Sequence, residues 1–154
     1  MRAYYDITKA LKDQLANEIT NTVTLGDISE VDLNRRTIFP LAHIICNAGS
    51  IGERIITLDF SILFMDVVDI SLESTKDSSE PFYGNNNIQD VHNTQLAAAN
   101  LLTQAMLRGE LWDEYYQVVG DPTLEPFQDR FENVVAGWTL NFSVQIRNTD
   151  TSIC

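Results

Sequence analysis

Basic residues are scarce in this sequence: it has ten Lys and Arg against twenty-two Asp and Glu, which gives a formal net charge of −12 at pH 7. Proteins that grip nucleic acid do so with clustered Lys and Arg, so this balance argues against a dedicated nucleic-acid-binding domain. Long apolar runs are missing too. The most apolar stretch, Ile62–Val68, is interrupted by Asp66 and is far shorter than the roughly 20 residues of a membrane-spanning helix. The start of the chain carries charges throughout, so we expect no signal peptide and no membrane partner.

Cysteine and histidine are also rare, with two of each. Cys46 lies in an apolar segment and Cys154 is the last residue, a placement that fits neither a disulfide framework nor a metal site. His43 stands within the apolar segment Phe39–Cys46, where a hydrogen-bonded core or interface histidine is favoured over a catalytic base. His92 is expected to face solvent in the first turn of a helix. Neither histidine has a partner at metal-ligand spacing, so we expect no metal and no cofactor.

Motifs of catalysis are absent as well. The close glycine pair Gly49 and Gly52 lacks the Lys and the helix context of a phosphate-binding loop, so these residues are interpreted as turn glycines. Carboxylate pairs such as Asp66 with Asp69 are expected by chance on the solvated face of so acidic a chain. These absences favour a structural or interaction protein over an enzyme.

What the sequence does have is the composition of one globular domain spanning residues 1–154. The 17.4 kDa chain is 44% hydrophobic and 21% charged, and a chain of about 150 residues can bury a sizeable core without staples.

Apolar periodicity predicts two helices. Tyr4, Ile7, Leu11, Leu15 and Ile19 recur at spacings of three and four and would place one apolar stripe on a helix. Residues Ile88–Arg108 are rich in Ala and Leu and are followed by Gly109, which stands where a C-terminal cap is expected.

Alternating residues predict strands. The clearest are Ile56–Phe64 and Trp138–Ile146, and shorter strands are expected at Thr22–Leu25 and Phe39–Cys46, with a turn at Asn47–Gly52. After Ser61 the second face of the long strand also becomes apolar, with Leu63 and Met65. We therefore expect another element or another subunit to cover its far end.

The order of these elements predicts an α+β fold, with a mostly antiparallel sheet and two helices packed on one face. Residues Ser71–Asn87 interrupt the pattern with a long polar segment that contains Phe82 and Tyr83, and we interpret it as a loop or arm. The window Glu110–Glu132 is the most acidic of the chain. Its aromatic residues, which include Trp112, Tyr115 and Tyr116, suit a core or an interface equally.

Four segments carry a resemblance to a known family: Gly26–Ile44 (GDISEVDLNRRTIFPLAHI), Ile56–Ser71 (ITLDFSILFMDVVDIS), Asn93–Gly109 (NTQLAAANLLTQAMLRG) and Arg130–Ile146 (RFENVVAGWTLNFSVQI). Together they resemble a small virion protein of phages that infect Bacteroides-type bacteria, including the crAss-like phages. The similarity runs over roughly residues 4–147. The element order also resembles that of tail-terminator and tail-completion proteins, which repeat a sheet flanked by helices around a ring.

The resemblance implies a non-enzymatic ring in the neck or tail of the virion, made in the host cytoplasm and built from six or twelve copies. Its partners would be further copies and the portal, neck or tail proteins, and DNA would pass through the lumen without specific binding. Acidic residues on that lumen would repel phosphates. The arm would bridge subunits, and the expected interface residues are Leu63, Met65, Phe82, Tyr83, Trp112, Tyr115 and Tyr116.

Two other functions stay open at this point. One is an assembly adaptor or chaperone that is absent from the finished particle. The other is an enzyme of unfamiliar type, which a deep pocket with His43 or His92 beside an acid would favour.

Overall fold

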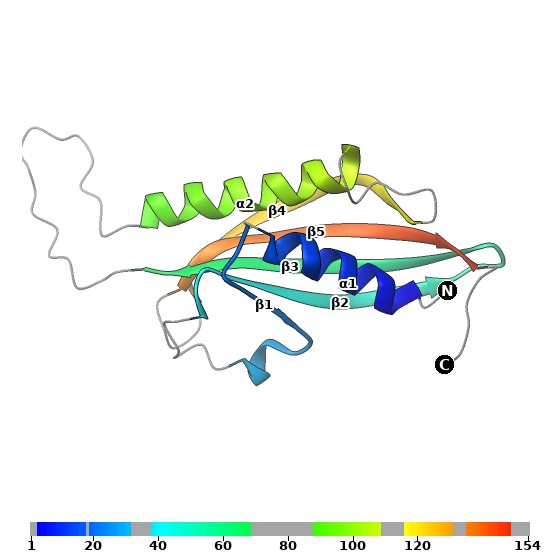
Figure 1. Cartoon of the computed structure of the whole chain (residues 1–154), viewed down its shortest axis with the longest axis horizontal. Helices are drawn as coiled ribbons and strands as arrows, with labels where there is room; N and C mark the ends of the chain where they lie inside the picture. The colour runs from blue at the N-terminus through cyan, green and yellow to red at the C-terminus, as the bar shows by residue number, and fades with distance from the viewer. Residues whose placement is uncertain are drawn as a thin grey trace, which may run out of the picture.

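Five strands form one sheet, and two helices lie on the same face of it (Figure 1). This computed structural model describes residues 3–17, 19–31, 38–68, 88–108, 116–130 and 135–148. The elements are α1 (Ala3–Ala16), β1 (Thr22–Leu25), the short 3-10 helix η1 (Ile28–Glu30), β2 (Leu41–Ile51), β3 (Ile55–Val67), α2 (Ile88–Arg108), β4 (Tyr116–Arg130) and β5 (Val135–Arg147).

The strand order is β1-β2-β3-β5-β4, and every neighbouring pair is antiparallel except β1 with β2. At the centre, β3 pairs with β5 in unbroken register from Ile55 opposite Arg147 to Val67 opposite Val135. The predicted α+β class with a mostly antiparallel sheet is therefore confirmed, and the two strands with the clearest alternation lie side by side.

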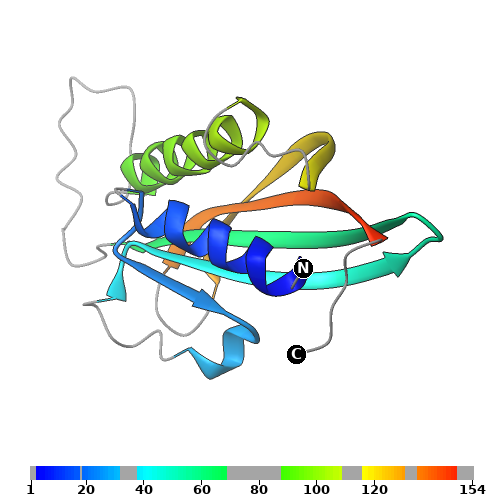
Figure 2. The same ribbon diagram turned by 45° about the vertical axis from the view of Figure 1, so that its right-hand side comes forward.

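The main core lies between the helices and one face of the sheet. From β3 and β5 it receives Phe60 and Phe142, whose rings stack with centroids 5.8 Å apart. The helices contribute the apolar stripes predicted from their spacing: Ile7, Leu11 and Leu15 from α1, and Ala98, Ala99, Leu102 and Met106 from α2. Figure 2 shows both helices on this side of the strands. Each helix therefore packs its apolar stripe against the same apolar face of the sheet.

A smaller core closes one end of the opposite face. Leu63 and Met65 are only 6% and 0% exposed there, and they pack with Phe39 and Phe127. Ile28, Val31 and Ile38 pack against the same cluster. Because the chain itself covers Leu63 and Met65, they leave no open surface for a neighbouring subunit. This corrects their assignment to an oligomer interface.

Two stretches of strand differ from the sequence-based expectation. The expected turn at Asn47–Gly52 is strand as far as Ile51, because a register shift between Cys46 and Ala48 lets the pairing with β3 continue. The acidic window holds the unexpected strand β4, in spite of Pro122 and Pro126. Proline is tolerated there because β4 is an edge strand, bonded to a neighbour strand on one side only.

Gly137 marks the closest approach in the central pair. A Cβ at this position would lie 1.8 Å from the carbonyl oxygen of Phe64, so any side chain would push β5 away from β3. We predict that Gly137→Ala lowers the free energy of unfolding by about 2–3 kcal/mol, measured by urea denaturation. Gly49→Ala is the control, because a Cβ there meets the flexible end of Leu58 at 3.1 Å; its cost should stay below about 1 kcal/mol. Equal costs for the two variants would contradict this packing.

Candidate functional site

The face of the sheet opposite the helices is open beyond the small core, and polar side chains line it. The register places Thr57, Asp59 and Ser61 of β3 beside Gln145, Ser143 and Asn141 of β5, respectively. Across β5, the strand β4 adds Gln117, Val119, Thr123 and Glu125 to the same face. We call this surface the open polar face; from β2 it also includes Asn47 and Ser50.

Hydrogen bonds tie the middle of the open polar face together across three strands. The Asn47 amide donates to the Ser61 hydroxyl over 2.5 Å, and Ser61 donates to the Asn141 side-chain oxygen over 2.5 Å. One register step away, the Ser143 hydroxyl donates to the Asp59 carboxylate over 2.5 Å. The register shift after Cys46 is what brings Asn47 onto this face. These polar groups satisfy one another, so the face can stay in contact with water without a covering element.

The charge on this face is negative and sparse. Asp59 and Glu125 are the carboxylates among the side chains that define the open polar face, and no Lys or Arg is among them. Arg147 also lies on this side, opposite Ile55 at the tip of the sheet. The surface is therefore able to hydrate and to repel an anion weakly, but it offers no cationic cluster that would hold one.

His43 lies on the same side of the sheet, opposite Leu63 of the small core, but it is buried. It is 0% exposed; its Nε2 donates to the Gly26 carbonyl oxygen over 2.9 Å, and its Nδ1 lies 2.6 Å from the Thr24 hydroxyl. A carbonyl only accepts, so Nε2 carries the proton and Nδ1 accepts from Thr24. Burial lowers the pKa of His43, which keeps the ring neutral. The interpretation as a hydrogen-bonded core histidine is confirmed.

His92 is half-buried, so the expectation that it faces solvent is wrong. Its Nε2 donates to the carbonyl oxygen of Phe127 over 3.1 Å, and its own backbone carbonyl accepts from the indole N–H of Trp138 over 2.8 Å. The imidazole and indole rings lie 5.9 Å apart. His92 therefore fastens α2 to β4 and β5, and its Nε2 is engaged in that structural contact.

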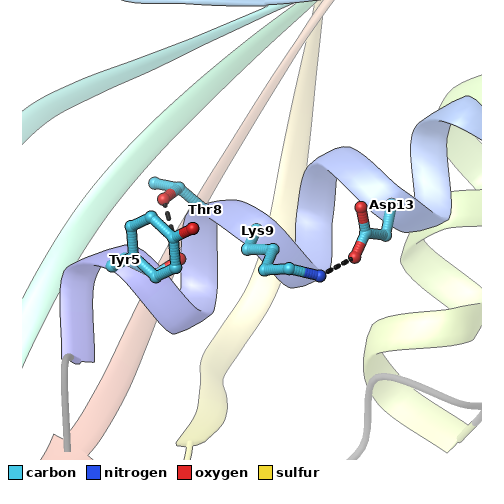
Figure 3. Close-up of polar contacts among 4 residues, drawn as sticks. All are labelled: Tyr5, Thr8, Lys9 and Asp13. Carbon is cyan, nitrogen blue, oxygen red and sulfur yellow. Dashed lines mark hydrogen bonds and ion pairs between the residues drawn. The ribbon is translucent and has the colours of Figure 1, made fainter.

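A groove of about 380 Å³ separates α1 from the edge strand β1. Its lining includes Tyr4, Tyr5, Lys12 and Leu25, and neither histidine contributes to it. Figure 3 shows four of the α1 residues that line the groove: the Thr8 hydroxyl donates to the backbone oxygen of Tyr5 over 3.1 Å, and Lys9 pairs with Asp13 over 2.6 Å. The groove is amphipathic, with tyrosine rings and lysine ammonium groups along the same rim.

Ser143 bonds a carboxylate without a histidine to act as base, so the pair lacks the third member of a nucleophilic triad. Within the residues that the structure describes, no group of three or more His, Cys, Asp or Glu could hold a metal ion.

The remaining predicted interface residues fall largely outside the description. Phe82, Tyr83, Trp112 and Tyr115 lie outside the described residues, and Tyr116 is described only as the first residue of β4. Sequence reasoning did not single out the open polar face. The polar residues that alternate with apolar ones in β3 and β5 do indicate this face. By itself, however, the alternation predicts only that one side of each strand is polar.

Comparisons with known proteins leave the family open. No family model matches the chain, and no curated protein matches it by sequence. In the described ranges, neither helix has both the length and the apolar character to span a bilayer.

The buried His43 predicts an acid-sensitive fold. The pKa of His43 is lowered by burial in the folded state, so its contribution to stability is present above the unfolded value of about 6.5 and is lost as the pH falls through the folded pKa. We expect the free energy of unfolding to decline as the pH falls below about 6.5. His43→Gln, which keeps a hydrogen-bonding side chain, should be less stable at neutral pH and should flatten this decline. The measurement is urea denaturation across the pH range; an equal slope in both proteins would contradict the assignment.

Proposed function

We propose that this chain is a non-enzymatic structural protein of a phage virion. In this proposal, copies of the chain form a closed ring in the neck or tail, and DNA passes through the ring. The resemblance of its sequence to virion proteins of crAss-like phages suggests the setting. The observation that carries the proposal is the open polar face, which no described element covers where it is polar and whose defining side chains include no Lys or Arg.

A channel of this kind must let DNA, a polyanion, pass without binding it tightly. Duplex DNA carries one phosphate charge about every 1.7 Å of its axis. A lumen rich in Lys or Arg would bind it and release counterions, so the duplex would be held rather than passed. Hydroxyl and amide groups that are already bonded to one another, as Asn47, Ser61 and Asn141 are, offer few unpaired donors to the phosphates. The carboxylates of Asp59 and Glu125 add a weak repulsion.

The two faces of the sheet suit the two sides of a ring wall. The face with α1 and α2 buries the main core and would form the body of the wall. The open polar face would line the lumen, since it is the sheet surface that can remain wet. Ring closure requires a head-to-tail interface between copies, to which exposed apolar side chains away from the open polar face would contribute.

This proposal predicts that cations on the open polar face impede DNA. Gln117 and Thr123 are exposed on β4, so the double substitution Gln117→Lys and Thr123→Lys should leave the fold intact. We expect particles that carry it to assemble but to eject DNA more slowly, with infectivity reduced on the order of tenfold because each Lys can now bind a phosphate. The readouts are titre per particle and DNA release from purified particles at low and high salt.

Two controls separate channel charge from other effects. Gln117→Glu with Thr123→Glu changes the same positions without adding cations and should preserve infectivity. Asn100→Lys with Gln104→Lys adds the same charge to exposed positions of α2 and should also be harmless. Normal DNA release from particles with the β4 lysines would contradict the channel proposal. Absence of the protein from purified particles would favour an assembly adaptor instead.

A further inference from the structure

The outer edge of β1 carries backbone groups that no strand binds within the described part of the chain. On the β2 side, the backbone N–H groups of Thr22 and Gly26 donate to carbonyl oxygens over N···O distances of 3.3 Å and 3.1 Å, respectively. Successive residues of a strand direct their backbone groups to opposite edges, so those of Val23 and Leu25 point away from β2. β1 comes first in the strand order. Val23 and Leu25 therefore each offer a donor and an acceptor to an added strand.

The side chains beside this edge form part of the groove between α1 and β1. Val23 and Leu25 stand opposite Ala42 and Ile44 of β2, which belong to the main core, so they point to the side of the sheet that α1 covers. Tyr5 of α1 also lines the groove, and Tyr5 and Leu25 are 57% and 48% exposed. An exposed apolar patch next to an open strand edge is typical of an interaction surface.

The main core holds the α1 side of the groove in place. Ile7 and Leu11 of α1 are buried, and the ring of Tyr4 stacks on Phe60 with centroids 6.4 Å apart. The groove, with its volume of about 380 Å³, is therefore formed before a partner arrives. A preformed site binds more tightly because less conformational freedom is lost on binding.

The charge beside the groove favours an acidic partner. Lys9, Lys12 and Asp13 line the groove, and Figure 3 shows Lys9 joined to Asp13, over 2.6 Å. The charges of that pair offset each other. Lys12 makes no ion pair within the described part of the chain, so its ammonium group is the one that a carboxylate of a partner would meet.

The direction of α1 sets the order of the two contacts. α1 and β1 run in opposite directions (Figure 2). Tyr5 therefore lies toward the end of β1, where Leu25 is, and Lys12 lies toward its beginning, where Val23 is. A strand added antiparallel to β1 would meet Leu25 first and Val23 two residues later, and residues two apart share a face of a strand. Such a strand needs an apolar side chain beside Tyr5 and, two residues on, a carboxylate beside Lys12.

We propose that the groove and the outer edge of β1 bind an extended acidic segment of another protein as an added antiparallel strand. The recognised segment has an apolar residue, any residue, and then Asp or Glu. Backbone hydrogen bonds to Val23 and Leu25 supply affinity, and the two side chains of the segment supply selectivity. This binding does not depend on the proposed ring, because it uses the face of the sheet opposite the open polar face.

The other edge strand of the same chain is a poor source of this segment. β4 holds two stretches with the required pattern, Val119–Asp121 and Phe127–Asp129. Gly120 interrupts the first, because its φ of 68° is not that of an extended strand. Phe127 is buried and its carbonyl oxygen accepts from His92, so the second is already packed within its own copy. The expected occupant is therefore a separate protein rather than a second copy.

The test uses a fluorescent synthetic heptapeptide, Thr-Thr-Phe-Thr-Glu-Thr-Thr, and the reversed sequence, which has the same composition. We expect the forward peptide to bind the full chain at least about fivefold more tightly, because it alone places Phe beside Tyr5 and Glu beside Lys12 in an antiparallel strand. Lys12→Glu should weaken binding of the forward peptide roughly tenfold at low salt. A peptide with Lys in place of Glu should recover binding to this variant. The readout is fluorescence anisotropy over a concentration series at low and high salt.

A second pair of variants tests the strand edge itself. Leu25→Ala removes one side chain of the groove, whereas Leu25→Pro also removes the outward N–H group. The bonds between β1 and β2 do not use that group, so both variants should fold, which urea denaturation checks. We expect the proline variant to bind the forward peptide about fivefold more weakly than the alanine variant, because one backbone hydrogen bond is lost. Equal affinities of the two variants would contradict strand addition.

Three further results would overturn the proposal. Equal binding of the forward and reversed peptides would reduce the contact to attraction between charges. Absence of binding at millimolar peptide would remove the site. Wild-type chain that self-associates, and that loses this association in Lys12→Glu, would make a second copy the occupant. Asn100→Glu on the exposed side of α2 is the charge control and should bind the forward peptide as the wild type does.

Discussion

The central pairing of β3 with β5 is the constraint on which the other features depend. Both strands have thirteen residues, and they are in register along their whole length. Because side chains alternate between the faces of a strand, this register sends Phe60, Ile62 and Phe64 to one side and Asp59 and Ser61 to the other. A shift by one residue would exchange the two sides, burying the polar groups and exposing the aromatic rings. The close approach at Gly137 helps to hold the register in place.

The two candidate surfaces follow from what lies at either side of this pair. On one side, α1 and α2 cover the apolar face, and the groove forms where α1 meets the short strand β1. On the other side, the open polar face extends from β2 across β3 and β5 to β4. His43 connects the two regions, because its bonds to Thr24 and Gly26 hold the end of β1 against β2. The open polar face and the groove therefore lie on opposite sides of the sheet.

Among the described residues, electrostatic pairing adds little to stability. The ion pair between Lys9 and Asp13 is exposed on α1, where solvent and salt screen the attraction between the two charges. Burial instead carries the fold, with Phe60, Phe64, Leu15 and Leu102 among the largest fully buried side chains. Two polar groups oppose it. The side-chain oxygen of Gln95 is buried without a partner. Burial raises the pKa of Asp66, because it disfavours the charged form of the carboxyl group.

The sequence by itself determined the elements whose residues repeat regularly. The stripe from Ile7 to Leu15, the Ala-rich run from Ile88 to Arg108, and the alternation in β3 and β5 each require one conformation to bury their apolar side chains. Those patterns also determined the α+β class, because a sheet with one apolar face needs helices to cover it. The core role of His43 was readable for the same reason, since only apolar neighbours surround it in sequence.

Tertiary structure decided the features that depend on which strands become neighbours. β4 can form a strand because its position at the edge of the sheet tolerates two prolines. Its own acidic sequence does not show that it lies at an edge. Leu63 and Met65 are covered by Phe39 and Phe127, which are distant in sequence. His92 is engaged by Phe127 and Trp138 from two other strands. The open polar face and the groove exist only once five strands and a helix are assembled, because local periodicity specifies which side of each element is polar but not which elements adjoin.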